Sequence, residues 1–115
     1  MARTPEEVFG HHVEALGAGD LDEIVADYAD DAVFITPGGV LRGKDGIRAG
    51  FTQLLADVPN AAWAVPTQIY EDDLLFLEWT ADAAQTRVDD GIDTFVFRDG
   101  LIRAQTVRYT LQHKT

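Results

Sequence analysis

In the first segment of the chain, apolar residues recur with the 3.6-residue period of an amphipathic helix. Thr4 is placed to cap this helix, Pro5 takes its first position, and Glu7 completes a capping box. His12 falls on the apolar face of the helix. The other members of that face are Val8, Phe9, Val13 and Leu16. The pattern predicts a first helix that ends near Gly17 and carries a histidine on its buried side.

Two further segments show the same period. A short helix is expected after Asp20, which can form a second capping box with Glu23. Its apolar residues are Leu21, Ile24, Val25 and Tyr28. A third helix is expected from about Lys44 to Asp57, before the helix-stopping Pro59. Its apolar stripe comprises Ile47, Phe51, Leu54, Leu55 and Val58.

Elsewhere apolar and polar residues alternate, as they do in strands with one buried face. Strands are expected at 32–36, 40–42, 61–70, 74–82, 86–98 and 101–112. Asp72-Asp73 and Asp99-Gly100 provide two-residue hairpin turns, and Asp-Gly is a strong hairpin signal. Helices followed by an antiparallel meander predict an α+β fold, with the helices packed on one face of the sheet.

Length and charge limit the classes of function. The 115 residues suffice for one domain, 1–115, and the 46% hydrophobic content is enough for a packed core. Twenty acidic residues against 9 basic ones give a formal net charge of −11. This charge repels the phosphates of nucleic acids and the surfaces of anionic membranes. We therefore expect no nucleic-acid partner and no membrane partner.

Several chemistries are disfavoured by what the sequence lacks. It contains no cysteine and no serine, and its three histidines do not follow a zinc-binding spacing. No glycine-rich loop fits a phosphate or a dinucleotide, so we expect neither a metal nor a cofactor. Residues 1–5 contain no apolar stretch like that of a signal peptide, and no apolar run is long enough to cross a bilayer. The expected location is cytoplasmic.

Asp93 is the first candidate for chemistry. Strand alternation places it on the same side as Phe95 and Phe97. A carboxyl group among phenylalanines would lose its hydration, which raises its pKa and favours the neutral, hydrogen-bond-donating form. The alternative is a half-exposed aspartate beside an acidic turn at 89–91.

His12 and Glu78 are further candidates for a chemical role, and each can also be explained as an ordinary structural residue. His12 is either a core residue or a proton carrier that needs an acidic partner across a cavity. Glu78 shares a face with Phe76 and Thr80, and that face either lines a cavity or lies outside, with residue type favouring the outside. The polar-tipped and aromatic residues Tyr28, Phe51, Trp63 and Tyr109 are either pocket walls or core.

Segments along nearly the whole chain resemble the NTF2-like superfamily, which includes ketosteroid isomerases, SnoaL-like polyketide cyclases and limonene-epoxide hydrolases. The resemblance lies in 12–22 and 28–32, in Pro37 and Arg42-Gly43 before the third helix, and in 92–95 before the Gly100 hairpin. It implies a cone in which three N-terminal helices pack on a strongly curved antiparallel sheet and enclose a pocket. It also implies a homodimer formed through the exposed face of the sheet.

The resemblance assigns roles to individual residues. The oxyanion-binding tyrosine of the isomerases matches His12, their general-base aspartate matches Thr36, and their protonated aspartate matches Asp93. Because threonine is no base at neutral pH, the base would have to come from elsewhere, and Glu78 is the provisional choice. The resemblance also implies pocket positions at Phe76, Glu78, Thr80, Gln105, Val107 and Tyr109, and aromatic pocket residues at Tyr28 and Phe51.

These observations predict a SnoaL-like pocket protein for a small hydrophobic carbonyl or hydroxy compound. Any reaction would be a cofactor-free isomerisation, cyclisation or dehydration, with Asp93 as donor or acid and His12 as donor or proton shuttle. Trp63 and Phe95 are expected to help bind the ligand. A non-catalytic ligand-binding or dimerisation module is the first alternative. An epoxide hydrolase-like enzyme is the second, although alternation points its required Arg108 away from the pocket.

Overall fold

The three predicted helices are present in the computed structural model, which describes residues 3–115. Met1 and Ala2, part of the segment used for the signal-peptide argument, lie outside the described residues. The helices are α1 (Pro5–Ala18), α2 (Leu21–Ala26) and α3 (Gly43–Asp57). The Thr4 hydroxyl accepts from the Glu7 amide, and the Glu7 carboxylate accepts from the Thr4 amide, which confirms the capping box. None of the helices in the described part of the chain is long and apolar enough to span a membrane.

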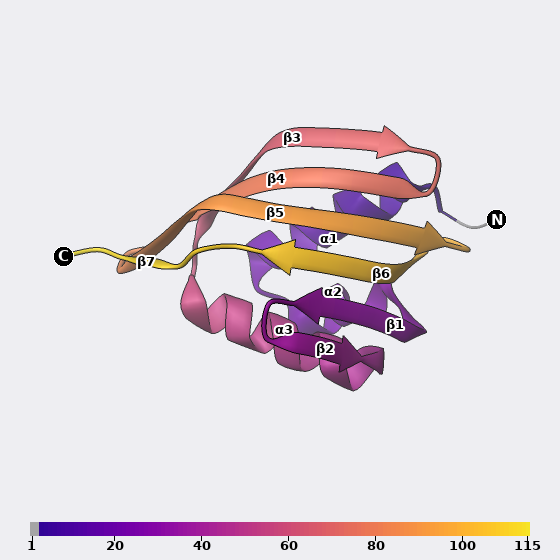
Figure 1. Ribbon diagram of the computed structural model, residues 1–115, viewed down its shortest axis with the longest axis horizontal. Helices are drawn as coiled ribbons and strands as arrows, with labels where there is room; N and C mark the ends of the chain where they lie inside the picture. The colour runs from indigo at the N-terminus through magenta and orange to yellow at the C-terminus, as the bar shows by residue number, and fades with distance from the viewer. Residues whose placement is uncertain (1–2) are drawn as a thin grey trace.

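The strands form one mixed sheet in the order β2-β1-β6-β5-β4-β3, and a short β7 pairs with β5 (Figure 1). They are β1 (Tyr28–Thr36), β2 (Gly39–Arg42), β3 (Ala62–Glu71), β4 (Leu74–Asp82), β5 (Thr86–Arg98), β6 (Leu101–Arg108) and β7 (Gln112–His113). The β4 and β5 bounds agree with the predictions. The first strand starts at Tyr28, which had been expected in a helix, and the last predicted strand is interrupted between β6 and β7.

One pair of neighbouring strands departs from the predicted antiparallel sheet. β1 runs parallel to β6, with Tyr28 opposite Ile102 and Phe34 opposite Gln105. The sequence pattern does not contain this pairing, because it joins segments separated by more than half of the chain. Its effect is to bring the start of β1 beside the strand that carries Gln105.

Register shifts bend the sheet around the helices. One lies between Ala64 and Thr67 of β3, and another lies where β5 carries an extra residue opposite Trp79–Ala81 of β4. Such bulges increase the local bend and twist of a sheet. The helices lie on the concave side (Figure 1), with Val8 and Phe9 of α1 buried against it.

Helix α3 lies close to β1 and β2. A Cβ atom added to Gly50 would lie 2.8 Å from the Phe34 ring, and one added to Gly46 would lie 2.9 Å from the backbone carbonyl carbon of Leu41. The two glycines therefore permit α3 to pack closely against β1 and β2.

We predict opposite effects for alanine at two helical glycines. Gly10→Ala, at an exposed position of α1 where the added Cβ would meet no atom within 4 Å apart from the neighbouring backbone of its own helix, should raise the free energy of unfolding by about 0.5–1 kcal/mol through helix propensity. Gly46→Ala should lower it by about 1 kcal/mol or more, because the Leu41 backbone must move. Urea denaturation of both variants measures the difference. Equal stabilisation by both would contradict the close packing of α3.

Candidate functional site

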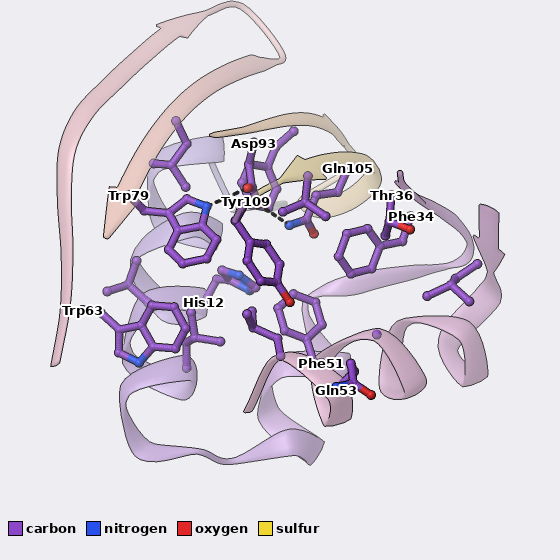
Figure 2. A pocket seen from close by; sticks show the side chains of 18 of the residues that line it. His12, Phe34, Thr36, Phe51, Gln53, Trp63, Trp79, Asp93, Gln105 and Tyr109 are labelled. Carbon is purple, nitrogen blue, oxygen red and sulfur yellow. Dashed lines mark hydrogen bonds between the residues drawn. The ribbon is translucent and has the colours of Figure 1, made fainter. Parts of the chain in front are cut away.

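A cavity of about 490 Å³ lies between the helices and the concave face of the sheet (Figure 2). Its wall is mostly apolar. It is lined by Phe9, His12, Val13, Leu16, Phe34, Thr36, Pro37, Leu41, Ala49, Gly50, Phe51, Gln53, Leu54, Trp63, Val65, Leu77, Trp79, Asp93, Phe95, Gln105, Val107, Tyr109 and Leu111. This volume and composition are typical of a site for a small organic molecule.

Asp93, on β5, is the carboxylate of this cavity and is 5% exposed. The indole nitrogen Nε1 of Trp79 donates a hydrogen bond to its Oδ1 over 2.7 Å, and Nε2 of Gln105 donates to its Oδ2 over 2.6 Å (Figure 2). Behind them, the buried Tyr28 hydroxyl donates to Oε1 of Gln105. Both carboxylate oxygens thus have fixed donors, as a buried charge requires.

Two opposing influences set the protonation of Asp93. Burial raises its pKa to about 6, while the hydrogen bonds from Trp79 and Gln105 act in the opposite direction. The carboxylate therefore predominates at pH 7, and the neutral acid is close to it in free energy. A group with such a pKa is suited to both accepting and returning a proton near neutral pH.

His12 faces the same cavity from α1 and is 3% exposed. Burial lowers its pKa to about 4, against the opposing effect of the Asp27 charge. The ring is therefore neutral at pH 7. It lies 5.4–6.0 Å from the rings of Tyr28, Phe51 and Phe95, centroid to centroid. Among the described residues, its Nδ1 is a buried side-chain polar atom without a hydrogen-bond partner.

Aromatic side chains from β3, from β4 and from the residue after β6 meet at another part of the wall. The ring of Trp79 lies 5.5 Å from those of Trp63 and Tyr109. The Tyr109 hydroxyl donates to the Asp57 carboxylate over 2.7 Å, which ties the end of β6 to α3. Burial, together with this bond, raises the pKa of Tyr109. This tyrosine is therefore neutral, and its hydroxyl is already engaged.

The structure brings most of the predicted site residues to one cavity. Those in its wall are His12, Phe51, Trp63, Asp93, Phe95, Gln105, Val107 and Tyr109. Thr36, at the position of the isomerase base, also lines it, but its hydroxyl accepts from the Gly38 amide over 3.1 Å. The alternative for Asp93, a half-exposed aspartate beside an acidic turn at 89–91, is wrong, because β5 runs unbroken from Thr86 to Arg98 and Asp93 is buried.

The predicted pocket positions on β4 are wrong. Phe76, Glu78 and Thr80 are partly or largely exposed on the outer face, whereas Leu77 and Trp79 between them line the cavity. Neighbouring residues of a strand point to opposite sides, so Glu78 cannot reach the cavity that Trp79 lines. Glu78 is therefore excluded as the base. Arg108 is exposed and absent from the wall, which agrees with its predicted direction and removes the support for the epoxide hydrolase alternative.

Tyr28, predicted as an aromatic pocket residue, also lies elsewhere. It is fully buried and is not part of the cavity wall, and it acts on the site through Gln105. Trp79, in contrast, lines the cavity but was not among the predicted site residues. Two-residue spacing puts it on the same face of β4 as Leu75 and Leu77, but its hydrogen bond to Asp93 depends on the pairing of β4 with β5.

Within residues 3–115, no group of three or more His, Cys, Asp or Glu side chains is placed to hold a metal ion. The potential donor groups of the cavity instead suit an organic ligand, since they are one carboxylate, one neutral imidazole and uncharged amides and hydroxyls.

Three helices packed on a curved sheet, with a largely apolar cavity between them, define the class of fold. The profile of the SnoaL-like domain matches residues 9–105, and the chain belongs to this family. No functionally curated protein matches it significantly.

Many solved structures share the fold. A protein of unknown function from Burkholderia xenovorans, described as NTF-2 like, is 24% identical, with 92% of this chain and 82% of that chain covered and a TM-score of 0.76. IdmH, a candidate polyketide cyclase from Streptomyces antibioticus, is 19% identical over 93% and 92%, with a TM-score of 0.75. A candidate ketosteroid isomerase from Kribbella flavida is 13% identical over 96% and 81%, with a TM-score of 0.77.

The two buried groups should influence stability with opposite dependence on pH. Asp93 has a raised folded pKa, so its contribution to stability falls as pH rises from about 4 to 6. His12 has a lowered folded pKa, so its contribution is complete above about 6.5 and is lost as pH falls toward 4. In the wild-type protein the two effects largely cancel.

Single substitutions should expose each effect. Relative to wild type, Asp93→Asn should be more favourable at pH 7 than at pH 4.5 by about 2 kcal/mol, and His12→Phe should show the reverse. Urea denaturation at both pH values measures this. A difference from wild type that does not change with pH would contradict the assignment for the residue replaced.

Proposed function

We propose that this protein binds a small, neutral, largely apolar carbonyl or hydroxy compound and catalyses cofactor-free acid–base chemistry on it. The observation that carries the proposal is Asp93, a buried carboxylate with a pKa of about 6 in the wall of an apolar cavity shared with a neutral His12. Structures of the same fold include candidates for polyketide cyclase and ketosteroid isomerase, which agrees with this class of reaction.

The charges of the cavity favour a neutral ligand. Of the residues that the structure describes, no lysine or arginine lines the cavity, and the ionisable side chains in its wall are His12, Asp93 and Tyr109. At pH 7 only Asp93 contributes a charge, and that charge is negative. With a formal net charge of −11 on the whole chain, carboxylate or phosphate ligands are disfavoured.

The reaction would begin with proton transfer to Asp93. The C–H bond next to the ligand carbonyl breaks, its proton moves to a carboxylate oxygen, and the electron pair forms an enolate. Neutral His12 can donate one hydrogen bond to the developing oxyanion, where a donor is most effective in a water-poor cavity. Asp93 then returns the proton to another carbon or to a leaving hydroxyl. Isomerisation and dehydration both follow this sequence.

A non-catalytic binding module is the second candidate. The observation in its favour is that both Asp93 oxygens already accept hydrogen bonds from Trp79 and Gln105. In such a module Asp93 would orient these side chains and would not exchange protons with the ligand.

We expect a flat phenol to bind through its hydroxyl to the Asp93 carboxylate. Tryptophan fluorescence should show affinity that rises roughly tenfold or more as pH increases through 6, because hydrogen bonds to charged groups are strong. Asp93→Asn should remove the pH step, and His12→Ala should weaken binding. The methyl ether of the same phenol, which cannot donate, should show no step, and Glu78→Gln on the outer face should behave as wild type.

Catalysis is tested separately. Incubation with a flat cyclic ketone in D₂O should exchange its α-hydrogens faster than buffer does, and Asp93→Asn should abolish the excess exchange. A pH step in phenol binding without any exchange would favour the binding module. Binding that is indifferent to pH and to Asp93→Asn would contradict both roles of this carboxylate.

We further propose that two copies of the chain associate through the outer face of the sheet. Strand register aligns exposed or threonine side chains in one row across this face, and the row runs Val40, Ile35, Thr106, Thr94, Phe76 and Ile69. In the neighbouring row, Glu78 and Arg108 flank the exposed Ile92. An antiparallel second copy would place these opposite charges against each other, which favours self-association.

Phe76→Glu should convert the proposed dimer to a monomer, because it replaces an exposed phenylalanine of this row, next to the exposed Ile69, with a charged side chain. Light scattering coupled to size-exclusion chromatography measures the mass. Thr52→Glu, an exposed position on α3, is the matched control and should leave the dimer intact. A wild-type monomer at all concentrations would overturn the proposal.

A further inference from the structure

The indole of Trp79 lies directly over Gly91. These two residues are opposite each other in the β4–β5 pairing. A Cβ atom built on Gly91 would lie 2.2 Å from Cε2 of Trp79, 2.3 Å from Cδ2 and 2.6 Å from Nε1. No side chain other than hydrogen fits there while the indole stays in place. The glycine is thus required for space at this position.

The packing of the Trp79 indole on Gly91 directs the indole nitrogen toward Asp93. Asp93 lies two residues after Gly91 on the same face of β5, diagonal to Trp79, within reach of an aromatic side chain. The resulting hydrogen bond is 2.7 Å long and fully buried. Figure 2 shows the indole nitrogen pointing at the carboxylate along the wall of the cavity.

A bulge in β5 lies next to this contact between Trp79 and Gly91. Trp79 pairs with Gly91 and Ala81 with Val88, so two steps on β4 match three on β5. The extra residue falls at Asp89–Asp90, immediately before Gly91. Since a bulge changes the direction in which nearby side chains point, the bulge and the packing on Gly91 together fix the position of the indole.

We propose that Trp79 is a positioning residue for Asp93, and that Gly91 acts through it, so that together they hold the carboxylate ionised and correctly oriented toward the ligand. This inference rests on the proposed role of Asp93 as proton acceptor. Gln105 supplies the second donor from β6, but Trp79 is the donor whose direction is unambiguous, because an indole N–H can only donate.

Besides Trp79, the uncharged amide of Gln105 also donates to Asp93, and the titratable groups near it do not change charge while Asp93 titrates. The titratable side chains nearby are His12 from α1, Tyr28 from β1 and Tyr109 after β6. Burial keeps all three neutral between pH 5 and 8. The Asp57 carboxylate of α3 is hydrogen-bonded to Tyr109. A change in the pKa of Asp93 on removal of the indole N–H therefore reports the loss of that donor.

The test compares the two tryptophans of the cavity. Trp79→Phe keeps an aromatic ring but removes the N–H, and should raise the pKa of Asp93 by about one unit. Trp63→Phe removes an indole whose ring lies 5.5 Å from that of Trp79, and should leave the pKa unchanged. The measurement is a ¹³C NMR titration of the aspartate carboxyls without ligand, with the Asp93 signal identified by its loss in Asp93→Asn.

Gly91→Ala should raise the pKa of Asp93 as Trp79→Phe does, because its Cβ displaces the indole. The double variant should show no further rise. An unchanged pKa in Trp79→Phe, or an equal rise in Trp63→Phe, would overturn the inference. If Gly91→Ala does not fold, the two tryptophan variants still decide the matter.

The pKa is read without ligand, so its outcome is independent of whether the phenol binds or the ketone exchanges. With the phenol present, the midpoint of the pH step should move upward in Trp79→Phe together with the pKa. A purely structural role of Trp79 would weaken binding at every pH and leave the midpoint in place, which would also overturn the inference.

Discussion

The site depends on keeping one carboxylate inside an apolar cavity. A buried charge costs free energy unless fixed donors replace its lost hydration. For Asp93, Trp79 on β4 and Gln105 on β6 are those donors, and Tyr28 on β1 holds Gln105. The arrangement needs the four strands β1, β6, β5 and β4 side by side in this order. β1 joins the other three through its parallel pairing with β6, which places Tyr28 beside the strand that carries Gln105.

Burial acts in the same sense on Asp93 and His12, since it disfavours the charged form of each. It raises the pKa of Asp93 and lowers that of His12, so the imidazole stays neutral throughout the range in which the carboxyl titrates. In the proposed reaction His12 is then the hydrogen-bond donor and Asp93 the group that exchanges protons. The first expectation made Asp93 the donor or acid, His12 a donor or proton shuttle and Glu78 the provisional base, so the proposal moves the role of base from Glu78 to Asp93.

Local signals allowed most of the fold to be predicted, and nonlocal pairing explains what was missed. The Thr4 cap and the Asp99-Gly100 turn are fixed by adjacent residues, so the sequence identifies them directly. Alternation also separated Trp79 from Glu78 correctly. It does not say which of the two faces encloses a pocket, and the family resemblance assigned the wrong one. The contact of Trp79 with Gly91 depends on a bulge and a strand register that no short pattern encodes.

With Thr36 engaged in its turn and Glu78 outside, Asp93 is the only carboxylate that residues 3–115 place in the cavity wall. A reaction here must therefore use one group both to remove a proton and to return it. Such a mechanism requires that the two protonation states be close in free energy at the working pH, which a pKa of about 6 provides. It also requires that the carboxyl group stay in place while it changes charge. Donors from two different strands meet that need, because Trp79 and Gln105 can remain hydrogen-bonded to the carboxyl group in both protonation states. In the protonated state the oxygen that carries the proton still has a lone pair for its donor and can offer the proton to the ligand.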